Sequence, residues 1–280
     1  MTDVAAVFRE EYGRAVSVLV RSFGDIQLAE DCVQDAFLEA VRRWPVDGAP
    51  PNPAGWIITT ARNRAIDRMR RAAVAQPRER EALALASSPD PQEGAVNDDR
   101  LSLVFTCCHP ALSLEARVAL TLRLLGGLST VEIASAFLVA EPAMAQRLVR
   151  AKAKIRDANI PFRVPRGSDL PERLSAVLAV LYLIYTQGHL SRVDLAAEAI
   201  RMARVLVQLM PDEPEVRGLL ALMLLTESRR PARRVFVSLA HQDRSLWDAA
   251  LIAEGQSIVR DLVPRNRPGV YQLQAAIAAV

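Results

Sequence analysis

The sequence predicts an all-α protein, and three observations support that fold class. Ala, Leu, Val and Arg dominate a chain of 280 residues in which only 5% are aromatic, a balance that favours helices. Apolar residues recur at helical spacing in most segments, and no segment alternates between apolar and polar residues as a half-buried strand would. With 51% hydrophobic residues, the chain can fill two ordinary domains, or one domain with a long extension.

The net charge excludes nothing by itself. It is only +3, with an isoelectric point near 9.0, so any role in nucleic-acid binding has to come from local clustering of basic residues. The basic clusters described below provide such local positive charge.

Residues 1–71 are expected to form a first helical module. Apolar residues recur at helical spacing from Val4 to Arg21, and Gly24 should end that helix. Asp25 is a suitable N-cap for a second helix from about Ile26 to Trp44, which we expect Pro45 to end. The side chains expected to face inward are those of Val33, Phe37, Ala40, Val41 and Trp44.

An outward ridge on this second helix mixes acidic and apolar groups. It comprises Asp31, Gln34, Asp35 and Leu38. A basic helix of a partner protein could dock on such a ridge, although ridges of this composition are more often simply solvated.

A basic helix follows the proline-rich loop VDGAPPNPAG. It runs from Trp56 to Arg71, and Ile58, Ala61, Ala65 and Met69 make its buried stripe. The opposite arc combines an aromatic ring that can stack on a base with amide, hydroxyl and guanidinium groups for base edges and phosphates. This arc contains Trp56, Thr60, Asn63, Arg64, Asp67, Arg68 and Arg71. Arginines can also coat an exposed helix with their apolar stems, but that alternative leaves the exposed Trp unexplained.

Residues 72–99 are expected to be a flexible linker with at most one short helix. The helical pattern ends there, and acidic residues outnumber basic ones by six to three from Gln76 to Arg100. An acidic tether can lie in a cationic channel of a partner or screen the two basic modules from each other, and both alternatives stay open.

Residues 100–160 are expected to form a second module that ends in a helix-turn-helix. Ser113 should cap a helix that the glycine pair Gly126-Gly127 closes. Ser129 and Glu132 then form a capping box for a short helix from Thr130 to about Leu138. The turn falls at 140–142, and the last helix runs from Pro142 to about Ala158.

The last helix of this module is split into an apolar stripe and a basic face. Met144, Leu148, Ala151 and Ile155 should face the core, with Arg147, Arg150 and Lys154 about 90° away on one side and Lys152 on the other. Gln146 and Lys152 are further candidates for contact with DNA. A recognition helix needs this split, because it presents forked donors to guanine edges and phosphates. A solvated basic face on an ordinary helical hairpin is the alternative.

The cysteines point to a reducing, cytosolic compartment. Cys32, Cys107 and Cys108 follow no signal peptide, and the longest apolar run, 176–185, is too short to span a bilayer, so no membrane partner is expected. Adjacent cysteines before His109 lack the two-residue gap of a zinc knuckle. We therefore expect buried cysteines and no metal or other cofactor.

Residues 161–280 are expected to form a separate helical domain. Amphipathic helices are predicted at 172–187, 193–209, 215–227 and 244–263, separated by turn signals. Antiparallel helix pairs of this length suggest an α-solenoid. The chain ends on an apolar helical stretch, YQLQAAIAAV, which suggests that this domain is truncated.

Together these residues resemble the extracytoplasmic-function (ECF) class of bacterial RNA polymerase sigma factors, in the group with a C-terminal tetratricopeptide-like (TPR-like) domain. AEDCVQDAFLEAVRRW and GWIITTARNRAIDRMRR are similar to the family's region 2. FTCCHPALSLEARVALTLRLLGGLSTVEIA and MAQRLVRAKAKIRDANIPFRVP are similar to its region 4. The resemblance covers essentially the whole chain, in which Leu138 stands where many such turns have Gly and the TPR-like part is shorter than usual.

The resemblance implies roles for the residues singled out above. The ridge with Asp31, Gln34 and Asp35 would dock on the β′ clamp helices of core RNA polymerase, and region 4 would meet the β flap. The arc with Asn63, Arg64, Asp67 and Arg68 would engage the melted minus-ten promoter element, and the loop 46–53 would hold a flipped base. Arg147, Arg150 and Lys154 would meet the minus-thirty-five element in the major groove. The acidic linker would pass through the polymerase.

Two other function classes remain open from the residues alone. A one-component regulator would bind duplex DNA through the helix-turn-helix and sense a ligand with the C-terminal domain. A peptide-binding helical scaffold would bind no nucleic acid. An enzyme is not expected, because the chain has three scattered histidines, no evident pair of catalytic carboxylates and no Gly-rich phosphate loop.

Overall fold

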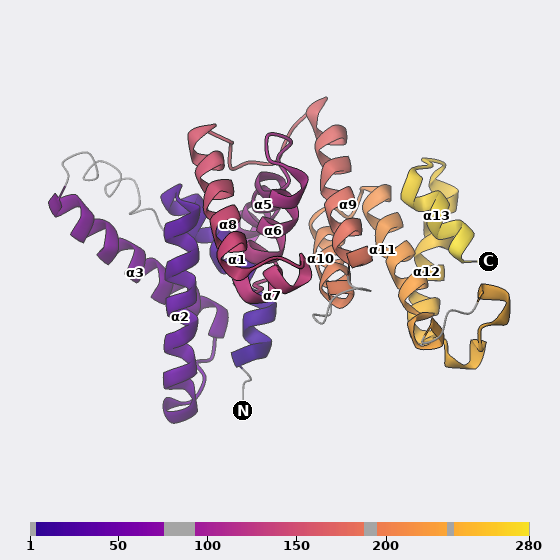
Figure 1. Ribbon diagram of the computed structural model, residues 1–280, viewed down its shortest axis with the longest axis horizontal. Helices are drawn as coiled ribbons and strands as arrows, with labels where there is room; N and C mark the ends of the chain where they lie inside the picture. The colour runs from indigo at the N-terminus through magenta and orange to yellow at the C-terminus, as the bar shows by residue number, and fades with distance from the viewer. Residues whose placement is uncertain (1–3, 76–92, 188–194, 234–237, 280) are drawn as a thin grey trace. The chain divides into compact units, whose positions relative to one another are not determined.

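The computed structural model describes residues 4–75, 93–187, 195–233 and 238–279, and every regular element in these ranges is a helix (Figure 1). The expected all-α fold class is confirmed. The chain divides into two compact units, Met1–Val177 and Leu178–Val280. Most of the predicted acidic linker, residues 76–92, lies outside the described residues.

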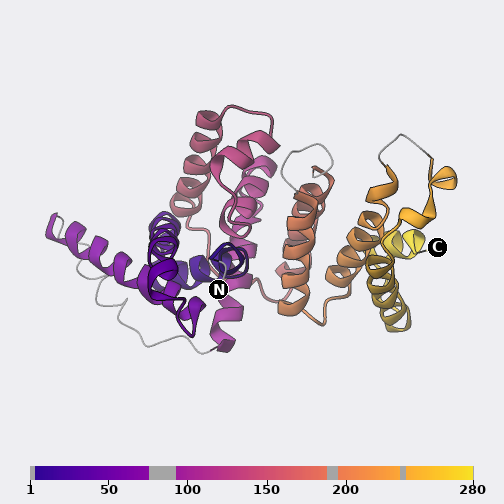
Figure 2. The same ribbon diagram turned by 90° about the horizontal axis from the view of Figure 1, so that it is seen from below.

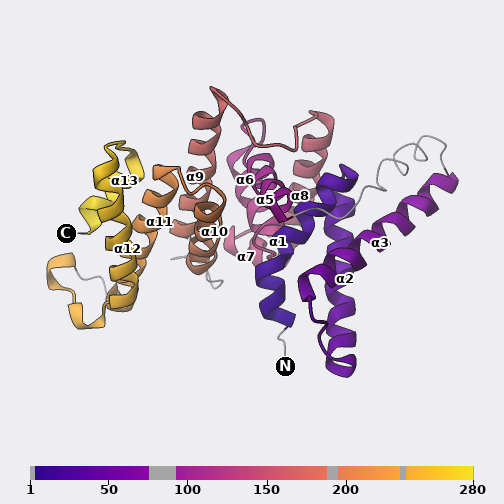
Figure 3. The same ribbon diagram turned by 180° about the vertical axis from the view of Figure 1, so that it is seen from behind.

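Three helices form the first part of unit 1: α1 (Val4–Phe23), α2 (Ile26–Asp47) and α3 (Pro53–Ala75). Gly24 ends α1 with a φ of 70°, and the Asp25 carboxylate caps α2 by accepting a hydrogen bond from the Leu28 amide at 3.0 Å. Both signals were predicted. Figures 1 and 3 show α3 crossing α2.

The predicted end of α2 is wrong, because the helix continues through Pro45 to Asp47. Proline removes one backbone donor, but its cost is small in a last turn that is exposed to water. The Gly48 amide still donates to the Trp44 carbonyl at 3.1 Å and closes the helix. Val41 lies on this outer side and is 55% exposed, so it is not a core residue.

The predicted start of α3 is also wrong. The helix begins at Pro53, inside the segment expected to be a loop. The Asn52 side chain accepts a hydrogen bond from the Gly55 amide at 2.9 Å, and proline suits the first helical position because no intrahelical partner exists there for an N–H. The buried stripe also differs from the predicted one. It is centred on Ile57, Ala61 and Ala65, whereas the predicted Ile58 and Met69 are half-buried.

Four further helices complete the helical core of unit 1 before α9: α5 (Glu93–Cys107), α6 (Leu114–Leu124), α7 (Thr130–Ala136) and α8 (Glu141–Asp157). The Ser113 hydroxyl caps α6. Ser129 and Glu132 form the capping box of α7, as predicted. Because α1 packs on α5 and α6 as well as on α2 and α3, the two predicted modules share one compact unit.

Gly127 shows how closely these modules approach each other. It has a φ of 73°, and a Cβ atom built on it would lie 2.7 Å from Cε1 of Phe8 in α1. Only glycine tolerates both the backbone conformation and the contact.

Unit 2 is built around a nearly fully buried helix, α11 (Pro214–Glu227). It packs against α10 (Leu195–Leu209), α12 (Ala249–Leu262) and α13 (Val270–Ala278), and Figure 2 shows these helices from a second direction. The helix α9 (Asp169–Gln187) contains the boundary between the units. Short 3-10 turns lie at Arg230–Arg233, Leu239–His241, Arg244–Leu246 and Val263–Arg265.

The helix predicted at 244–263 is broken into two elements. A 3-10 turn at Arg244–Leu246 precedes α12, which begins at Ala249. The cause is local, since the Asp248 carboxylate accepts hydrogen bonds from the amides of Ala250 and Leu251 and so starts a new helix.

The apolar C-terminal stretch does find a partner. It forms α13, whose Ala275 is buried against Ala221 and Leu222 of α11. The Glu215 carboxylate accepts hydrogen bonds from the backbone amides of Tyr271 (3.1 Å) and Gln272 (3.2 Å) and thereby caps α13 from the neighbouring helix. Among the described residues, no helix combines the length and the hydropathy needed to cross a membrane.

Candidate nucleic-acid interface

The second helix of the helix-turn-helix, α8, is divided as the sequence predicted. Met144, Leu148, Ala151 and Ile155 are all buried, so they hold the helix on α6 and α7. Gln146, Arg150 and Lys154 are exposed, and Arg147 is half-buried. The helix therefore presents an amide and three cations outside its apolar stripe.

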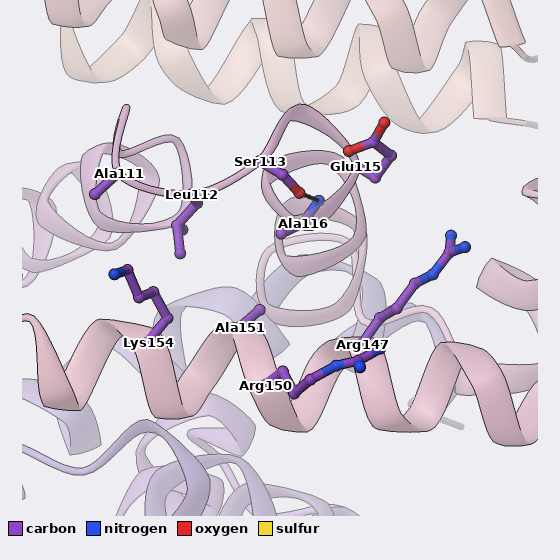
Figure 4. A pocket seen from close by; sticks show the side chains of 9 residues that line it. All are labelled: Ala111, Leu112, Ser113, Glu115, Ala116, Arg147, Arg150, Ala151 and Lys154. Carbon is purple, nitrogen blue, oxygen red and sulfur yellow. Dashed lines mark hydrogen bonds between the residues drawn. The ribbon is translucent and has the colours of Figure 1, made fainter.

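The three cations border a groove between α8 and the start of α6 (Figure 4). Its volume is about 410 Å³, enough for a group of the size of a phosphodiester. The α8 side is lined by Arg147, Arg150, Ala151 and Lys154, and the α6 side by Ala111, Leu112, Ser113, Glu115 and Ala116. The N-terminus of α6 adds its partial positive charge to this groove.

One carboxylate shares the groove with these cations. Hydrogen bonding to its own backbone amide, and then to the Ser113 hydroxyl, lowers the pKa of Glu115, and the guanidinium of Arg147 contributes in the same direction. Figure 4 shows Arg147 extending from α8 on the side of the groove where Glu115 lies. Three cations against one anion leave the groove positive overall.

On the other side of α8, Lys152 points away from this groove. Its ammonium group pairs with the Glu30 carboxylate of α2 and donates to the Gln27 side chain at 2.7 Å. Glu30 also pairs with Arg123 of α6, and it is only 2% exposed. Lys152, predicted to contact DNA, is therefore held between the two modules here.

The basic arc of α3 is likewise divided. Arg68 pairs with Asp35 at 2.6 Å and approaches Asp31 at 3.7 Å. Arg64 pairs with Glu39 at 3.2 Å and Asp35 at 3.6 Å. Two arginines predicted to bind DNA thus reach two aspartates predicted to bind polymerase.

The rest of the arc faces outward. Asn63, Asp67 and Arg71 are exposed, whereas Thr60 is half-buried. Trp56 is also half-buried, and its ring packs edge-on against that of Trp44 with their centroids 5.6 Å apart. The face left for a ligand is therefore narrower than the sequence predicted.

Comparison with known proteins assigns families to three segments. Residues 7–74 match Sigma-70 region 2, and residues 102–155 match Sigma-70 region 4. Residues 173–263 match a family of unknown function, DUF6596. No solved structure matches the chain.

The chain is also similar to two curated proteins. The probable ECF RNA polymerase sigma factor SigI of Mycobacterium tuberculosis is 29% identical over 167 residues, which cover 58% of this chain and 57% of SigI. An uncharacterized protein of Rhizobium meliloti is 41% identical over 289 residues, which cover 95% of this chain and 67% of that protein. The chain belongs to the sigma-70 family, as an ECF sigma factor.

As a member of this family, the sigma factor directs promoter recognition. A one-component regulator needs only the helix-turn-helix, so it does not account for a region 2 ahead of region 4. In the sigma factor, α2 and α3 belong to region 2, and α6, α7 and α8 to region 4.

The residues of the predicted polymerase ridge all lie on α2. They differ in whether they are paired within the chain or exposed. Asp31 and Asp35 pair with Arg68. Gln34 donates to Glu30 at 3.1 Å and to the Tyr12 hydroxyl at 3.4 Å, and burial raises the pKa of Tyr12. Leu38 is 57% exposed, which suits an apolar contact with a partner.

Sequence analysis of the sigma factor missed two acidic residues that organise these surfaces. Glu39 binds Arg64 and Arg43, and Glu30 binds Arg123 and Lys152. A signal for Glu30 existed, because it falls in helical register with Val33 and Phe37, which were predicted to be buried. A carboxylate in an apolar stripe requires a partner.

The cysteines of the sigma factor are buried free thiols. Burial raises the pKa of Cys107 and raises that of Cys108 to about 11, so both stay protonated near neutral pH. Burial also lowers the pKa of the adjacent His109. Within the described ranges, no group of three or more His, Cys, Asp or Glu residues is placed to hold a metal ion.

Proposed function

We propose that region 4 of this sigma factor contacts the minus-thirty-five element through the outer side of α8. Gln146 and Arg150 would meet base edges, while Arg147 and Lys154 would each hold a backbone phosphate in the groove beside α6. The observation that carries this proposal is the groove itself, where three cations face a helix N-terminus. Lys152 would take no part while it is paired with Glu30.

The binding of region 4 to its element should depend strongly on salt. Each neutralised phosphate releases about 0.9 counterion from B-DNA, so Arg147 and Lys154, with one phosphate each, would give a slope near −1.8 in a plot of log affinity against log salt concentration. Replacing Arg147 or Lys154 with Ala should reduce that slope by about one unit without changing base preference. Unchanged slopes for both variants on the cognate promoter would contradict this placement of α8.

Region 2 would contact the minus-ten element and the core polymerase. The exposed part of the α3 arc would engage the melted minus-ten strand. It consists of Asn63, Asp67 and Arg71, with Trp56 and Thr60 at its edge. The α2 ridge would dock on the β′ clamp helices through Leu38 and the outer side of Asp31. Arg64 and Arg68 would act mainly by fixing α3 on α2, and region 4 would meet the β flap.

The two regions would have to separate when both promoter elements are bound. The minus-ten and minus-thirty-five elements lie, as their names indicate, about 25 base pairs apart. At 3.4 Å per base pair this separation is about 85 Å. Glu30 of region 2 and Lys152 of region 4 are in direct contact. This contact would therefore belong to a state of the sigma factor that has not engaged both elements.

The C-terminal helices would form a TPR-like regulatory domain that binds a protein partner. Among the described residues, α10, α12 and α13 each pack on α11, as neighbouring helices of such repeats do. We further propose that the protein works in the cytoplasm and has no catalytic activity of its own. A truncation ending near Arg166 tests the regulatory role, and unchanged core binding and transcription by the truncated chain would exclude it.

A further inference from the structure

The first half of α9 is bound to region 4, although α9 also carries the start of the segment that matches the family of unknown function, residues 173–263. Arg173 donates a hydrogen bond from Nη2 to the Phe105 carbonyl at 2.8 Å. This carbonyl belongs to the last turn of α5, where carbonyls lack partners within their own helix. The His109 amide donates to the Thr106 carbonyl at 3.3 Å instead. Arg173 therefore caps α5 from a different element.

The turn that Arg173 caps leads into the loop 109–113, and a second arginine holds that loop. Arg117 of α6 donates from Nε to the Leu112 carbonyl at 2.9 Å. Burial lowers the pKa of His109, at the start of the loop, and the charges of Arg173 and Arg117 lower it further. The position of the loop therefore depends on a cation of α9 as well as on one of α6.

The loop 109–113 is also one wall of the groove beside α8. Three of its residues, Ala111, Leu112 and Ser113, line the groove opposite the cations of α8. Figure 4 shows Lys154 on the side of the groove where Ala111 and Leu112 lie. A shift of the loop would therefore change the space beside the Lys154 ammonium group, where a phosphate is proposed to bind.

We propose that Arg173 is a positioning residue for promoter binding. By capping α5, it fixes the loop 109–113 at the distance from α8 that lets Lys154 hold its phosphate. Because Arg173 lies in the segment of unknown function, it connects that segment to the DNA-binding groove, and a displacement of α9 would weaken promoter binding. This inference rests on the proposed placement of a phosphate beside Lys154.

A cap that only stabilises the fold is the alternative, since a hydrogen bond from a charged group contributes to stability wherever it lies. The two roles differ in their dependence on salt. A loss of stability lowers the fraction of folded chain and so reduces every affinity by the same factor. A lost phosphate contact instead lowers the slope of log affinity against log salt concentration by about 0.9.

The test uses the full chain with core RNA polymerase on the promoter that transcript mapping identifies. Arg173→Met keeps the apolar stem of the side chain and removes the guanidinium group. We expect the salt slope to fall by about one unit, so that the loss of affinity is about three to four times larger at roughly 50 mM than at roughly 200 mM salt. Arg166→Met is the matched control, because Arg166 is an exposed arginine shortly before α9, and it should leave the slope unchanged.

A double variant tests whether Arg173 acts through Lys154. Lys154→Ala and the double variant Arg173→Met/Lys154→Ala should both lower the slope by about one unit, because both lose the same phosphate. A loss of about two units in the double variant would overturn the proposal, since Arg173 would then hold a phosphate of its own.

Two further outcomes decide between the roles. An unchanged slope for Arg173→Met, whatever its melting temperature, would reduce Arg173 to a structural cap and leave the proposed function standing. If Arg173→Met does not fold, Arg173→Gln, which keeps an amide donor, is measured in the same way. No promoter-directed transcript from the wild-type chain would contradict the proposed function and this inference with it.

Discussion

Arg68 of α3 donates a hydrogen bond to Asp35 of α2 across 2.6 Å. The pair joins two surfaces that the sequence assigned to different partners, promoter DNA and core polymerase. Asp35 also lies 3.6 Å from Arg64, so one carboxylate holds two arginines of the α3 arc. The position of the DNA-binding face therefore depends on the helix proposed to bind polymerase.

Arg68 and Arg71 should respond differently to replacement by Ala. Arg68→Ala removes a paired, half-buried side chain and should lower the free energy of unfolding by about 1 kcal/mol, since a partly exposed pair is screened by water. Arg71→Ala changes an exposed residue and should alter stability by less than about 0.5 kcal/mol while it reduces promoter melting. Urea unfolding and permanganate footprinting of the minus-ten region measure the two effects.

The control for Arg68 is its partner. If Arg68 acts through Asp35, the double variant Arg68→Ala/Asp35→Ala should be little worse than either single variant. Two results would instead assign Arg68 directly to DNA. One is a double variant whose loss of unfolding free energy is the sum of the two single losses. The other is an equal defect in promoter melting for Arg68→Ala and Arg71→Ala without loss of stability.

Glu30→Gln should destabilise unit 1 strongly. The substitution preserves shape but leaves Arg123 and Lys152, whose side chains are 15% and 11% exposed, without a charged partner. Breaking a buried ion pair in this way costs about 3 kcal/mol. Asp31→Asn is the matched change one residue away, at a side chain 43% exposed, and should cost less than about 1 kcal/mol. Equal unfolding midpoints for the two variants in urea would show that the Glu30 contacts contribute little.

Leu138→Gly should stabilise the helix-turn-helix. Leu138 has a φ of 52° and is 89% exposed, so it bears backbone strain without a compensating apolar contact. Glycine removes a strain of about 1 kcal/mol, part of which is offset by its greater freedom in the unfolded chain. Leu138→Ala keeps the Cβ atom and should leave the unfolding free energy unchanged. A thermal melt in which both variants fall below wild type would mean that the Leu138 side chain makes a stabilising contact.

Stability should fall as pH decreases through the ordinary titration range of histidine. Burial, with the charges of Arg173 and Arg117, lowers the pKa of His109 in the folded chain, and its Nδ1 atom accepts a hydrogen bond from the Ala111 amide at 3.1 Å. The unfolded chain therefore binds this proton more readily. The stabilisation is complete above about pH 6.5 and is lost as pH falls toward the folded pKa. His109→Gln should remove this part of the pH dependence of the melting temperature, and an unchanged pH profile would exclude His109 as its source.

Local signals in the sequence predicted much of the fold. Asp25, Ser113 and Ser129 cap helices as expected, because a capping hydrogen bond joins residues only two or three positions apart. The errors at Pro45 and Pro53 have the same origin. Both prolines were taken as helix breakers regardless of their position in the helix. An exposed last turn tolerates proline, and a first turn favours it.

Long-range pairing was the part that periodicity could not predict. Lys152 and Glu30 are 122 positions apart, and nothing in the spacing of either helix indicates that they meet. The same applies to Arg68 and Asp35, which are 33 positions apart. Lys152, Arg68 and Asp35 were therefore assigned to external partners, although part of their charge is neutralised within the chain.

The central claim is that this sigma factor directs core RNA polymerase to specific promoters through α8 and the outer face of α3. The most direct test is run-off transcription from fragmented genomic DNA, with the purified chain, core bacterial RNA polymerase and mapping of RNA 5′ ends. The account predicts discrete start sites that share upstream motifs near positions minus ten and minus thirty-five. Absence of discrete starts, while the chain alone still shifts duplex DNA in a gel, would contradict it.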